Sequence, residues 1–572
     1  MRGILFPGLD SFRLLSKELQ RAALWNVLLL IFQSCFEILS TMALLPLFYQ
    51  LTISSREASG SALLNKFIDL SGLISWPNLA FLIVLIFLLK NLAGLWLAHY
   101  QNRFVKRVAL TLTEELYRRF YQLEWIDFLQ THSAETARRI RITPAEFANN
   151  VVQGYLLVLA DLFVCVLMMA VMAFLDYRIV LVVTALSIVL ILSFVFIRRD
   201  IFSKANKAFL ELTPQSSLLL SQGIDSFAEV KIYKKEEYFL SRFMEIRAIA
   251  ADHLRKLKTL TTVPGRIFEV IGVLSLSSAI VYAKLIHSDP EGLILVLGLM
   301  SIAIYRIMPS LNRILVTWVQ IRSYSYSVSE VQNSFKKKQP TAVFEPGLVQ
   351  FEHAVQIRNL SFRYPESNAL LFQNLDLTFK KGDFLVMEGP SGAGKTTLMH
   401  LLAGLLTDYQ GQIWVDKTIL APAAIRSWQN KLSFVSQAPV VLDDTILKNV
   451  AFGEESIDLV RVKQALEFAL LDDFINEAPQ KLNTRVGENG LTLSGGQRQR
   501  LVMARAFYRE PEVFLLDEVT NQLDEENKFL LLSNLKKLAA SNKAILLISH
   551  DPMVKSFATS VVHLENGLIS QT

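Results

Sequence analysis

The stretch Gly389-Pro390-Ser391-Gly392-Ala393-Gly394-Lys395-Thr396 fills every fixed position of the phosphate-binding P-loop pattern. It follows an apolar run at 384–387, which predicts a buried strand, and it precedes Thr397, which opens a segment with the pattern of a helix. In such a loop, backbone N–H groups and the positive end of the helix surround phosphate oxygens. We therefore expect residues 389–397 to bind a nucleotide, with Lys395 at the β- and γ-phosphates and Thr396 at Mg²⁺.

Hydropathy divides the chain of 572 residues into two parts. With 52 % hydrophobic residues and a mean hydropathy of +0.35, part of the protein is expected in lipid. A bilayer requires about 20 apolar residues per helix, and six stretches come near that length: 25–49, 77–98, 152–175, 179–197, 263–286 and 292–318. Beyond residue 340 the apolar runs are short, as at 513–516 and 544–548, which is typical of buried strands.

This division predicts the fold class and three parts of the chain. Residues 1–330 form an α-helical membrane domain with six transmembrane helices and long cytoplasmic extensions. Residues 350–572 form an α/β P-loop NTPase domain. Residues 331–349, which include a run of three lysines followed by Gln339 and Pro340, form the linker between the two domains.

The distribution of positive charge predicts the orientation in the membrane. The chain has 58 Lys and Arg residues against 52 Asp and Glu residues. The excess lies before the first predicted span and after the second and fourth, so it indicates cytoplasmic segments rather than a nucleic-acid partner. Six spans return the chain to the side on which it starts. We therefore expect a multi-pass protein of the inner (plasma) membrane, with the N-terminus and the NTPase domain in the cytoplasm.

Two carboxylates end the apolar run at 513–516. Asp517 can hold Mg²⁺ through water, and Glu518 can polarise the water that attacks in an in-line phosphoryl displacement. An isolated Asp-Glu pair at the end of a strand would be a solvated turn. Because a P-loop lies upstream, we expect Glu518 to be catalytic and the nucleotide to be ATP.

Together with the segment Leu493-Ser494-Gly495-Gly496-Gln497, these motifs resemble those of the ATP-binding cassette (ABC) transporters of exporter type. The resemblance covers nearly the whole chain. In that family two cassettes pack head to tail, and each ATP lies between the P-loop of one subunit and the signature segment of the other. The resemblance therefore implies that Ser494, Gly495, Gly496 and Gln497 contact the nucleotide of a second subunit.

Four further positions match the family's pattern in the family's order. The resemblance implies that Tyr364 stacks on adenine, and that Gln437 contacts Mg²⁺ and communicates with the membrane domain. It implies that Asp524 is the carboxylate of the D-loop, and that His550 contacts the γ-phosphate and assists catalysis.

The resemblance also implies a dimer, because this chain has one membrane domain and one cassette, and the composite sites need two. The intact Glu518, His550 and signature segment favour a homodimer with two competent sites. A heterodimer with another chain is the alternative. One departure from the family is visible in the D-loop, where Asn521-Gln522 replace the common Ser-Ala; it removes no group needed for hydrolysis and bears on coupling between the sites.

Charged residues inside the predicted spans indicate the class of substrate. Lys90, Arg266 and Arg306 come from three different spans, and charges at such depth usually face a water-filled interior. A cavity lined by these cations favours an anionic head group. The sixth predicted span carries a further arginine, Arg313. The alternative is that Lys90 and Arg313 reach toward the membrane surface and Arg266 pairs with Glu269 one turn away.

Apolar residues at helical spacing in 58–74 predict an amphipathic helix at the outer membrane surface, or an ordinary loop helix. With the interior cations and the segment 227–233, this feature is similar to flippases for lipid-linked oligosaccharides. The resemblance implies translocation of an anionic, lipid-linked substrate, with a polyprenyl-diphosphate-linked oligosaccharide as the first choice. Flippases for lipid A or phospholipids, and exporters of peptides or hydrophobic drugs, are the alternatives.

Overall fold

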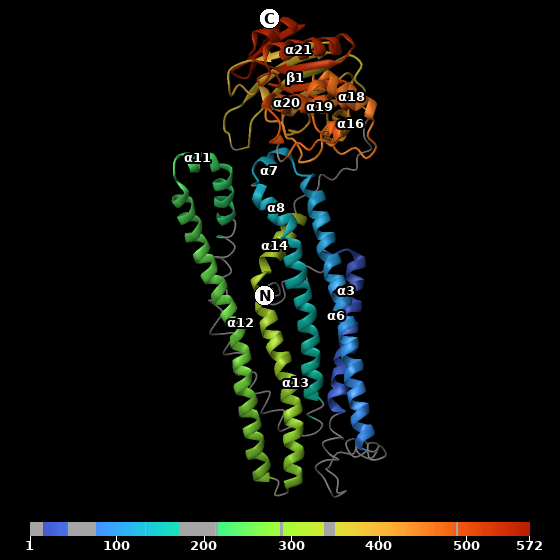
Figure 1. Cartoon of the computed structure of the whole chain (residues 1–572), viewed down its shortest axis with the longest axis vertical. Coiled ribbons are helices and arrows are strands. Elements are labelled where there is room, and N and C mark those ends of the chain that lie inside the picture. Colours follow the sequence, from blue (N-terminus) through green and yellow to red (C-terminus); the bar gives the residue numbers. More distant parts are fainter. Residues whose placement is uncertain are drawn as a thin grey trace. The chain divides into compact units, whose positions relative to one another are not determined.

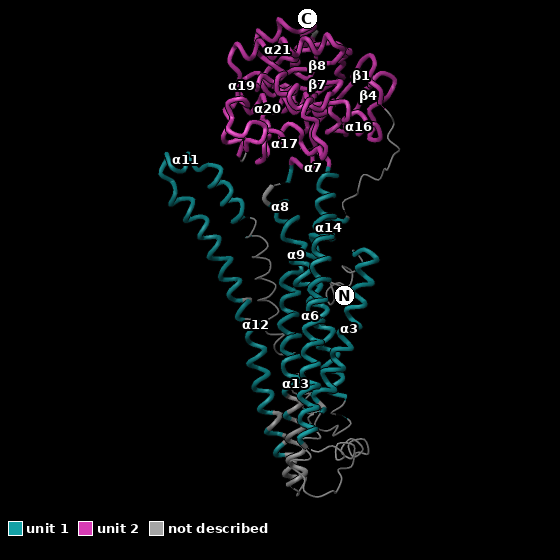
Figure 2. The backbone as a smooth tube through the Cα atoms, turned by 45° about the vertical axis from the view of Figure 1, so that its right-hand side comes forward, with its two compact units in different colours: residues 1–123, 130–339 teal, residues 124–129, 340–572 magenta. Residues whose placement is uncertain are grey.

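The computed structural model describes residues 15–43, 76–131, 133–170, 173, 212, 215–286, 290–336, 349–365, 367–487 and 490–571. The chain divides into two compact units: 1–123 with 130–339, and 124–129 with 340–572 (Figures 1 and 2). The predicted span at 179–197, the predicted surface helix at 58–74 and residues 337–348 of the predicted linker lie outside the described residues. The domain boundaries at 330 and 350 stay predictions.

The first unit consists of helices, four of which have more than 25 residues (Figure 1). They are α3 (Lys17–Met42), α6 (Trp76–Phe120), α8 (Ser133–Arg141), α9 (Thr143–Glu146), η1 (Phe147–Val152), α11 (Phe227–Ile232), α12 (Glu236–Ile286), α13 (Pro290–Ser323) and α14 (Ser325–Lys336). Among the described residues, three helical ranges are long and apolar enough to cross a membrane: Lys17–Thr41, Pro77–Phe120 and Thr143–Ala170. They overlap the first three predicted spans, and α12 and α13 contain the fifth and sixth.

Two of these helices are much longer than a bilayer requires. Helix α6 has 45 residues and α12 has 51, whereas about 20 residues cross the apolar layer. Their polar parts carry ion pairs between successive turns, such as Arg118–Glu114 at 2.8 Å and Lys256–Asp252 at 2.7 Å. These polar parts therefore continue the two helices beyond their apolar segments.

The helix that starts at Thr143 forms the centre of the first unit. Its π-helical segment η1 buries Phe147, which belongs to one apolar cluster with Val108 of α6 and Val331 of α14. Gly154 follows in the same helix, and a Cβ atom there would lie 2.8 Å from the Ile321 side chain of α13. The glycine therefore permits the close approach of α13 to this helix.

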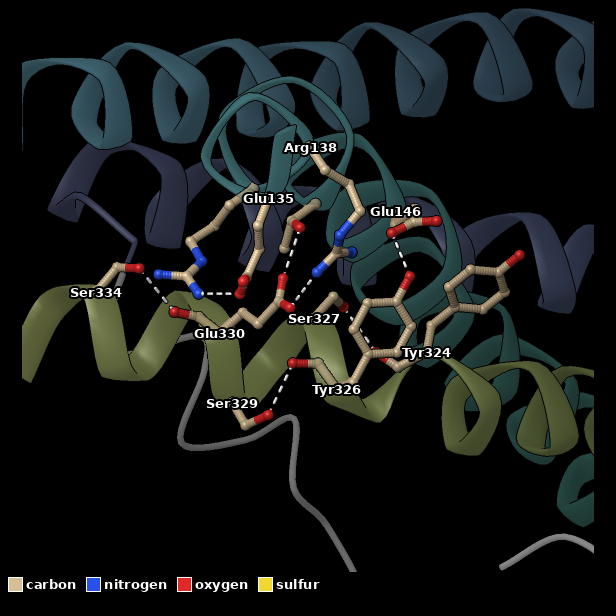
Figure 3. A network of polar contacts seen from close by, with 11 residues as sticks. Glu135, Arg138, Glu146, Tyr324, Tyr326, Ser327, Ser329, Glu330 and Ser334 are labelled. Carbon is tan, nitrogen blue, oxygen red and sulfur yellow. Dashed lines mark hydrogen bonds and ion pairs between the residues drawn. The ribbon is translucent and has the colours of Figure 1, made fainter. Parts of the chain in front are cut away.

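Polar contacts fix α14 against α8 and α9 (Figure 3). Tyr326 donates its hydroxyl hydrogen to Glu146, and one turn later Glu330 accepts hydrogen bonds from Arg138 and from Thr143 Oγ1, the latter at 2.7 Å. Tyr326 and Glu330 are four residues apart and so lie on one face of α14. That face is thus bound to the start of the central helix, and the contacts order the last helix before the linker.

The second unit contains two sheets. A four-stranded antiparallel sheet has the order β2-β1-β4-β5, with β1 (Ala354–Phe362), β2 (Phe372–Lys380), β4 (Gln410–Val415) and β5 (Thr418–Ile419). A six-stranded sheet has the order β10-β9-β3-β8-β7-β6, with β3 (Phe384–Glu388), β6 (Leu432–Val435), β7 (Val513–Asp517), β8 (Ala544–Ile548), β9 (Ser560–Glu565) and β10 (Leu568–Gln571). The predicted strands at 384–387, 513–516 and 544–548 are confirmed.

The core of the six-stranded sheet is parallel and lies between helices. Strands β6, β7, β8, β3 and β9 run parallel, and every residue of β7 and β8 is buried, as expected for a sheet covered on both faces. The helices of this unit are α7 (Trp125–Leu129), α15 (Lys395–Leu402), α16 (Pro422–Gln429), α17 (Ile446–Ala451), α18 (Leu459–Phe468), α19 (Asp472–Glu477), α20 (Gly495–Tyr508), α21 (Glu525–Ala540) and α22 (Pro552–Phe557).

Strand register places the candidate site at one edge of this sheet. Met387 of β3 and Asp517 of β7 both pair with Ile548 of β8, so the three strands end side by side. The P-loop follows β3, the Asp517-Glu518 pair ends β7, and His550 follows β8. Ligands of parallel α/β sheets bind at the carboxyl ends of the strands, which is where these groups meet.

Candidate nucleotide site

The P-loop needs glycine at two of its positions. Gly389 and Gly394 have φ values of 148° and 99°, in the range that favours glycine. A Cβ atom at Gly389 would lie 2.0 Å from the backbone oxygen of Leu564, and one at Gly394 would lie 2.8 Å from the Phe372 ring. The loop can therefore take this compact path only with glycine at both positions.

The Lys395 side chain folds back over the loop. Its Nζ donates to the backbone oxygens of Gly389 at 2.6 Å and of Pro390 at 3.0 Å, and the side chain is buried. The ammonium group thus lies at the mouth of the loop, at the amino end of α15. A phosphate bound there would meet both this cation and the end of the helix dipole.

Thr396 and Asp517 provide oxygen ligands of the kind that Mg²⁺ prefers. Thr396 Oγ1 donates to Asp517 Oδ2 at 2.7 Å. Burial raises the pKa of the Asp517 carboxyl, and the negative charge of Glu518 raises it further, while the hydrogen bond from Thr396 and the charge of Lys395 act in the opposite direction. A buried carboxylate of this kind gains from a cation beside it, so these residues fit a magnesium ion.

Glu518 is held in an uncommon backbone conformation, with φ at 51°. Its carboxylate oxygen Oε2 accepts hydrogen bonds from Gln437 Nε2 at 2.7 Å and from Asn521 Nδ2 at 2.8 Å. Its backbone oxygen accepts from Gln499 Nε2 at 2.9 Å. The structure therefore brings Gln437, Asn521 and Gln499 to Glu518, and none of these three contacts was predicted.

The remaining predicted residues lie around this centre or elsewhere in the cassette. The Tyr364 hydroxyl is 3.0 Å from Thr397 Oγ1, so this side chain reaches the start of α15. His550 is exposed just beyond β8. Asp524 caps α21 by accepting from the backbone N of Asn527 at 2.8 Å.

The signature segment begins a helix in its own chain. Ser494 is the N-cap of α20, and its hydroxyl accepts from the backbone N of Gln497 at 3.2 Å. The Gln497 side chain accepts in turn from the backbone N of Ser494 at 2.9 Å, which completes a capping box. The exposed amino end of α20 is thereby rigid, as an anion site provided for a second subunit would have to be.

The short helix α7 belongs to the second unit, although the residues before and after it in the sequence belong to the first. Trp125 of α7 lies with its ring centroid 5.2 Å from that of His400, at the end of α15. His400 also contacts the Phe434 ring at 5.7 Å, and burial lowers the pKa of its imidazole. The α7 segment thus contacts the helix that starts at the P-loop.

Comparison with known proteins agrees with this architecture. Residues 372–521 match the ABC transporter family. This part of the chain is an ABC transporter ATP-binding domain. A solved structure, a bacterial Atm1-family ABC exporter with ATP bound, aligns with a TM-score of 0.78 and 22 % identity, covering 96 % of this chain and 94 % of that one. The predicted fold class, a helical membrane domain followed by an α/β cassette, is therefore confirmed, and the chain has the fold of an exporter-type half-transporter.

Curated relatives of the chain include several ATP-dependent lipid A-core flippases. The protein from Alkalilimnicola ehrlichii is 25 % identical over 504 residues, 84 % of this chain and 83 % of the relative. The protein from Cupriavidus pinatubonensis is 28 % identical over 385 residues, 64 % of this chain and 63 % of the relative. The protein from Ralstonia nicotianae is 38 % identical over 226 residues, 39 % of this chain and 37 % of the relative. With the last two, the matched segments thus span less than two thirds of the relative.

The three cations predicted to bind substrate each have a separate partner in the first unit. Arg306 of α13 forms an ion pair with Glu37 of α3. Arg266 Nη1 is 3.2 Å from Glu269 Oε2, so the pairing named as the alternative is present, and Lys90 Nζ lies 4.7 Å from the centre of the Phe87 ring. The described contacts do not join the three cations to one another, and their shared role stays a prediction.

A second arginine of α13 is paired in the same manner as Arg306. Arg313 Nε lies 3.0 Å from Asp161 Oδ2, and Asp161 is buried in the helix that starts at Thr143. Glu37 and Asp161 were not expected as partners, because they lie far from α13 in the sequence. Both are carboxylates inside predicted spans, which is the signal that could have identified them.

Proposed function

We propose that this ABC transporter is an ATP-driven exporter or flippase of the membrane, which hydrolyses ATP and couples hydrolysis to translocation. The observation that carries the proposal is the group of Lys395, Thr396, Asp517 and Glu518 at the carboxyl edge of one sheet, in a chain that also has helices able to cross a membrane. The Atm1-family match supports the arrangement of these parts at the level of the fold.

The proposed roles follow from the geometry and the motif order. The P-loop residues and Thr397 bind the ATP phosphates, and Tyr364 supports the adenine. Thr396, Asp517 and Gln437 hold Mg²⁺, which when bound would neutralise phosphate charge. The amide oxygen of Gln437 is available for the metal while its Nε2 donates to Glu518. Glu518 orients and deprotonates the attacking water, and His550 contacts the γ-phosphate.

A second copy of the chain is the proposed partner. Ser494, Gly495, Gly496 and Gln497 would complete the nucleotide site of that copy, with Asp524 nearby. Exposed apolar side chains around α11, such as Ile224 at 64 % and Phe227 at 65 % exposure, suit a further contact with it. A heterodimer would satisfy the same contacts. The positive-inside rule places the cassettes in the cytoplasm and the helices in the inner membrane.

The proposed substrate is an anionic, amphipathic lipid. Arg306 is 16 % exposed at its side chain, and a buried guanidinium requires a negative partner, here Glu37. A diphosphate could replace that partner as the dimer changes state. A cavity of about 660 Å³ lies between α12 and α13. It is lined by Glu269, the partner of Arg266, and by Tyr305, which precedes Arg306 in the sequence. Of the three cations, Arg266 lies beside this cavity through its partner Glu269, whereas Arg306 pairs with Glu37 of α3.

Two lipids meet this description. A polyprenyl-diphosphate-linked oligosaccharide offers a diphosphate and a long apolar chain, as the resemblance to oligosaccharide flippases implies. Lipid A is also an anionic lipid, and it is favoured by the relatives that are named lipid A-core flippases. A neutral drug gains nothing from three cations.

We predict that neutralising Lys90, Arg266 and Arg306 together, each to Gln, slows lipid translocation at least about ten-fold, the loss expected from one charge-assisted hydrogen bond. ATP hydrolysis should persist, because no nucleotide ligand changes. The measurement is movement of a labelled polyprenyl diphosphate glycan and, separately, of labelled lipid A in reconstituted vesicles.

The matched control removes three cations that lie outside the spans. All three side chains are exposed: Arg118 pairs with Glu114, and Arg255 and Lys256 both pair with Asp252. Their triple Gln variant should translocate lipid like the parent. Equal translocation by both triple variants would refute the role of the three interior cations, and a parent that moves only peptide would refute the lipid class.

A further inference from the structure

The two D-loop residues that depart from the family pattern contact the catalytic centre. Asn521 Nδ2 donates to Glu518 Oε2 at 2.8 Å. Gln522 N donates to Gln499 Oε1 at 3.3 Å, while the Nε2 of the same Gln499 donates to the backbone oxygen of Glu518 at 2.9 Å. Glu518 is therefore fixed on both its carboxylate and its backbone by amide side chains.

The amide donors act on one oxygen of the carboxylate. Gln437 and Asn521 both donate to Oε2 of Glu518, and among the described residues no hydrogen bond to Oε1 is present. Two donors on one oxygen fix the plane of the carboxylate and direct its charge to the other oxygen. The free Oε1 is thus the oxygen that can accept a proton from a water molecule.

Gln437 and Asn521 differ in what else they can do. Gln437 has a proposed second task at Mg²⁺, so its position depends on the bound nucleotide. Asn521 is only three residues from Glu518, in the segment that follows β7, and its amide can hold the carboxylate whether or not Gln437 moves. A serine in this place, as the family commonly has, carries a shorter side chain and lacks the amide.

Gln499 ties this arrangement to the signature helix. Its side chain is buried at 3 % exposure on α20, whose amino end is Ser494. The Gln522 side chain also lies against the signature, because a Cβ atom at Gly495 would be 2.6 Å from Gln522 Oε1. A displacement at the signature segment would therefore reach Glu518 through Gln499.

We propose that Asn521 is a positioning residue for hydrolysis: it fixes Glu518 so that Oε1 faces the attacking water, and Gln499 anchors the same residue to the signature helix. The proposal rests on the proposed ATPase function. It gives the D-loop departure a chemical role, in which the amide of Asn521 replaces the common serine as a direct partner of the base.

Removing the amide should lower the turnover number and leave ATP binding intact. Asn521→Ala should reduce kcat about ten-fold, with KM for ATP within about two-fold, because hydrogen bonds to charged groups have effects of this size. Asn521→Asp has the same shape but brings a second negative charge beside Glu518, and it should reduce kcat more than Asn521→Ala. The matched control is Asn534→Ala, because Asn534 Nδ2 donates only to the backbone oxygen of Phe468, at 3.1 Å.

A double-mutant cycle distinguishes positioning from a general loss of structure. In the Glu518→Gln background, Asn521→Ala should cause no further loss of the residual rate, because the group on which it acts is gone. The thermal unfolding midpoint of the cassette should change equally for Asn521→Ala and Asn534→Ala. The full-length protein in lipid vesicles is used throughout, with ATP as the probe.

The outcomes separate this inference from the proposed function. A parent protein that binds ATP but does not hydrolyse it would refute the proposed function. A parent that hydrolyses ATP, together with an Asn521→Ala variant of unchanged kcat, or with the same loss in both backgrounds, would refute the role of Asn521 alone. A raised KM with unchanged kcat would also refute it.

Discussion

The Glu518→Gln variant is expected to bind ATP and Mg²⁺ like the parent but to hydrolyse ATP about 10² to 10⁴ times more slowly. The substitution removes the base and preserves the shape of the side chain, so the Thr396–Asp517 pair and the P-loop stay intact. ATP should then be trapped in a stable dimer. The measurements are the rate of phosphate release and the amount of nucleotide retained after gel filtration.

Two variants make this test specific. Lys395→Ala should instead weaken ATP binding, because the cation at the mouth of the loop is lost. Glu510→Gln is the matched control, since Glu510 is an exposed glutamate of the same domain, 3.7 Å from Arg461. It should hydrolyse ATP like the parent. A Glu518→Gln variant with near-normal phosphate release would show that another group is the base.

Mixed dimers of Lys395→Ala and Ser494→Ala chains are expected to recover up to about half the activity of the parent, whereas each variant alone has little. If Ser494 serves the nucleotide of the opposite subunit, one composite site in the mixed dimer holds both substitutions and the other holds neither. Differently tagged chains allow the mixed dimer to be purified in two steps.

Nucleotide stoichiometry keeps this test decisive even if turnover requires both sites. A mixed dimer should retain one ATP at its intact site when hydrolysis is blocked by Glu518→Gln in both chains. The Lys395→Ala homodimer, treated in the same way, should retain none. Mixed dimers that retain no ATP, or Ser494→Ala homodimers with normal turnover, would contradict the head-to-tail arrangement.

The sequence predicted the parts of the site that depend on local pattern. The P-loop and the Asp517-Glu518 pair follow strands whose apolar runs are recognisable, and parallel pairing brings the ends of such strands together. The P-loop pattern includes glycine at positions 389 and 394. The structure shows why: only glycine permits the backbone path at these two positions.

The contacts that the sequence did not reveal join side chains through tertiary packing. Gln499 reaches the backbone of Glu518 only because α20 packs against β6, the neighbour of β7 in the sheet, and no local pattern marks that amide. The partner of Arg306 is Glu37, on helix α3, which is far from Arg306 in the sequence. The charge of Arg306 predicted that a negative partner exists, and packing alone determines which carboxylate takes that place.

The most direct test of the account is ATP-dependent translocation by the parent protein in sealed vesicles. Vesicles contain fluorescent polyprenyl diphosphate glycan, fluorescent lipid A or a neutral lipid of equal chain length, and a membrane-impermeant quencher reports which leaflet each lipid occupies. We predict that ATP with Mg²⁺ moves at least one of the two anionic lipids and leaves the neutral lipid in place, and that vesicles with Glu518→Gln protein show no movement. Movement that is equal with and without ATP, or movement of the neutral lipid alone, would contradict the account.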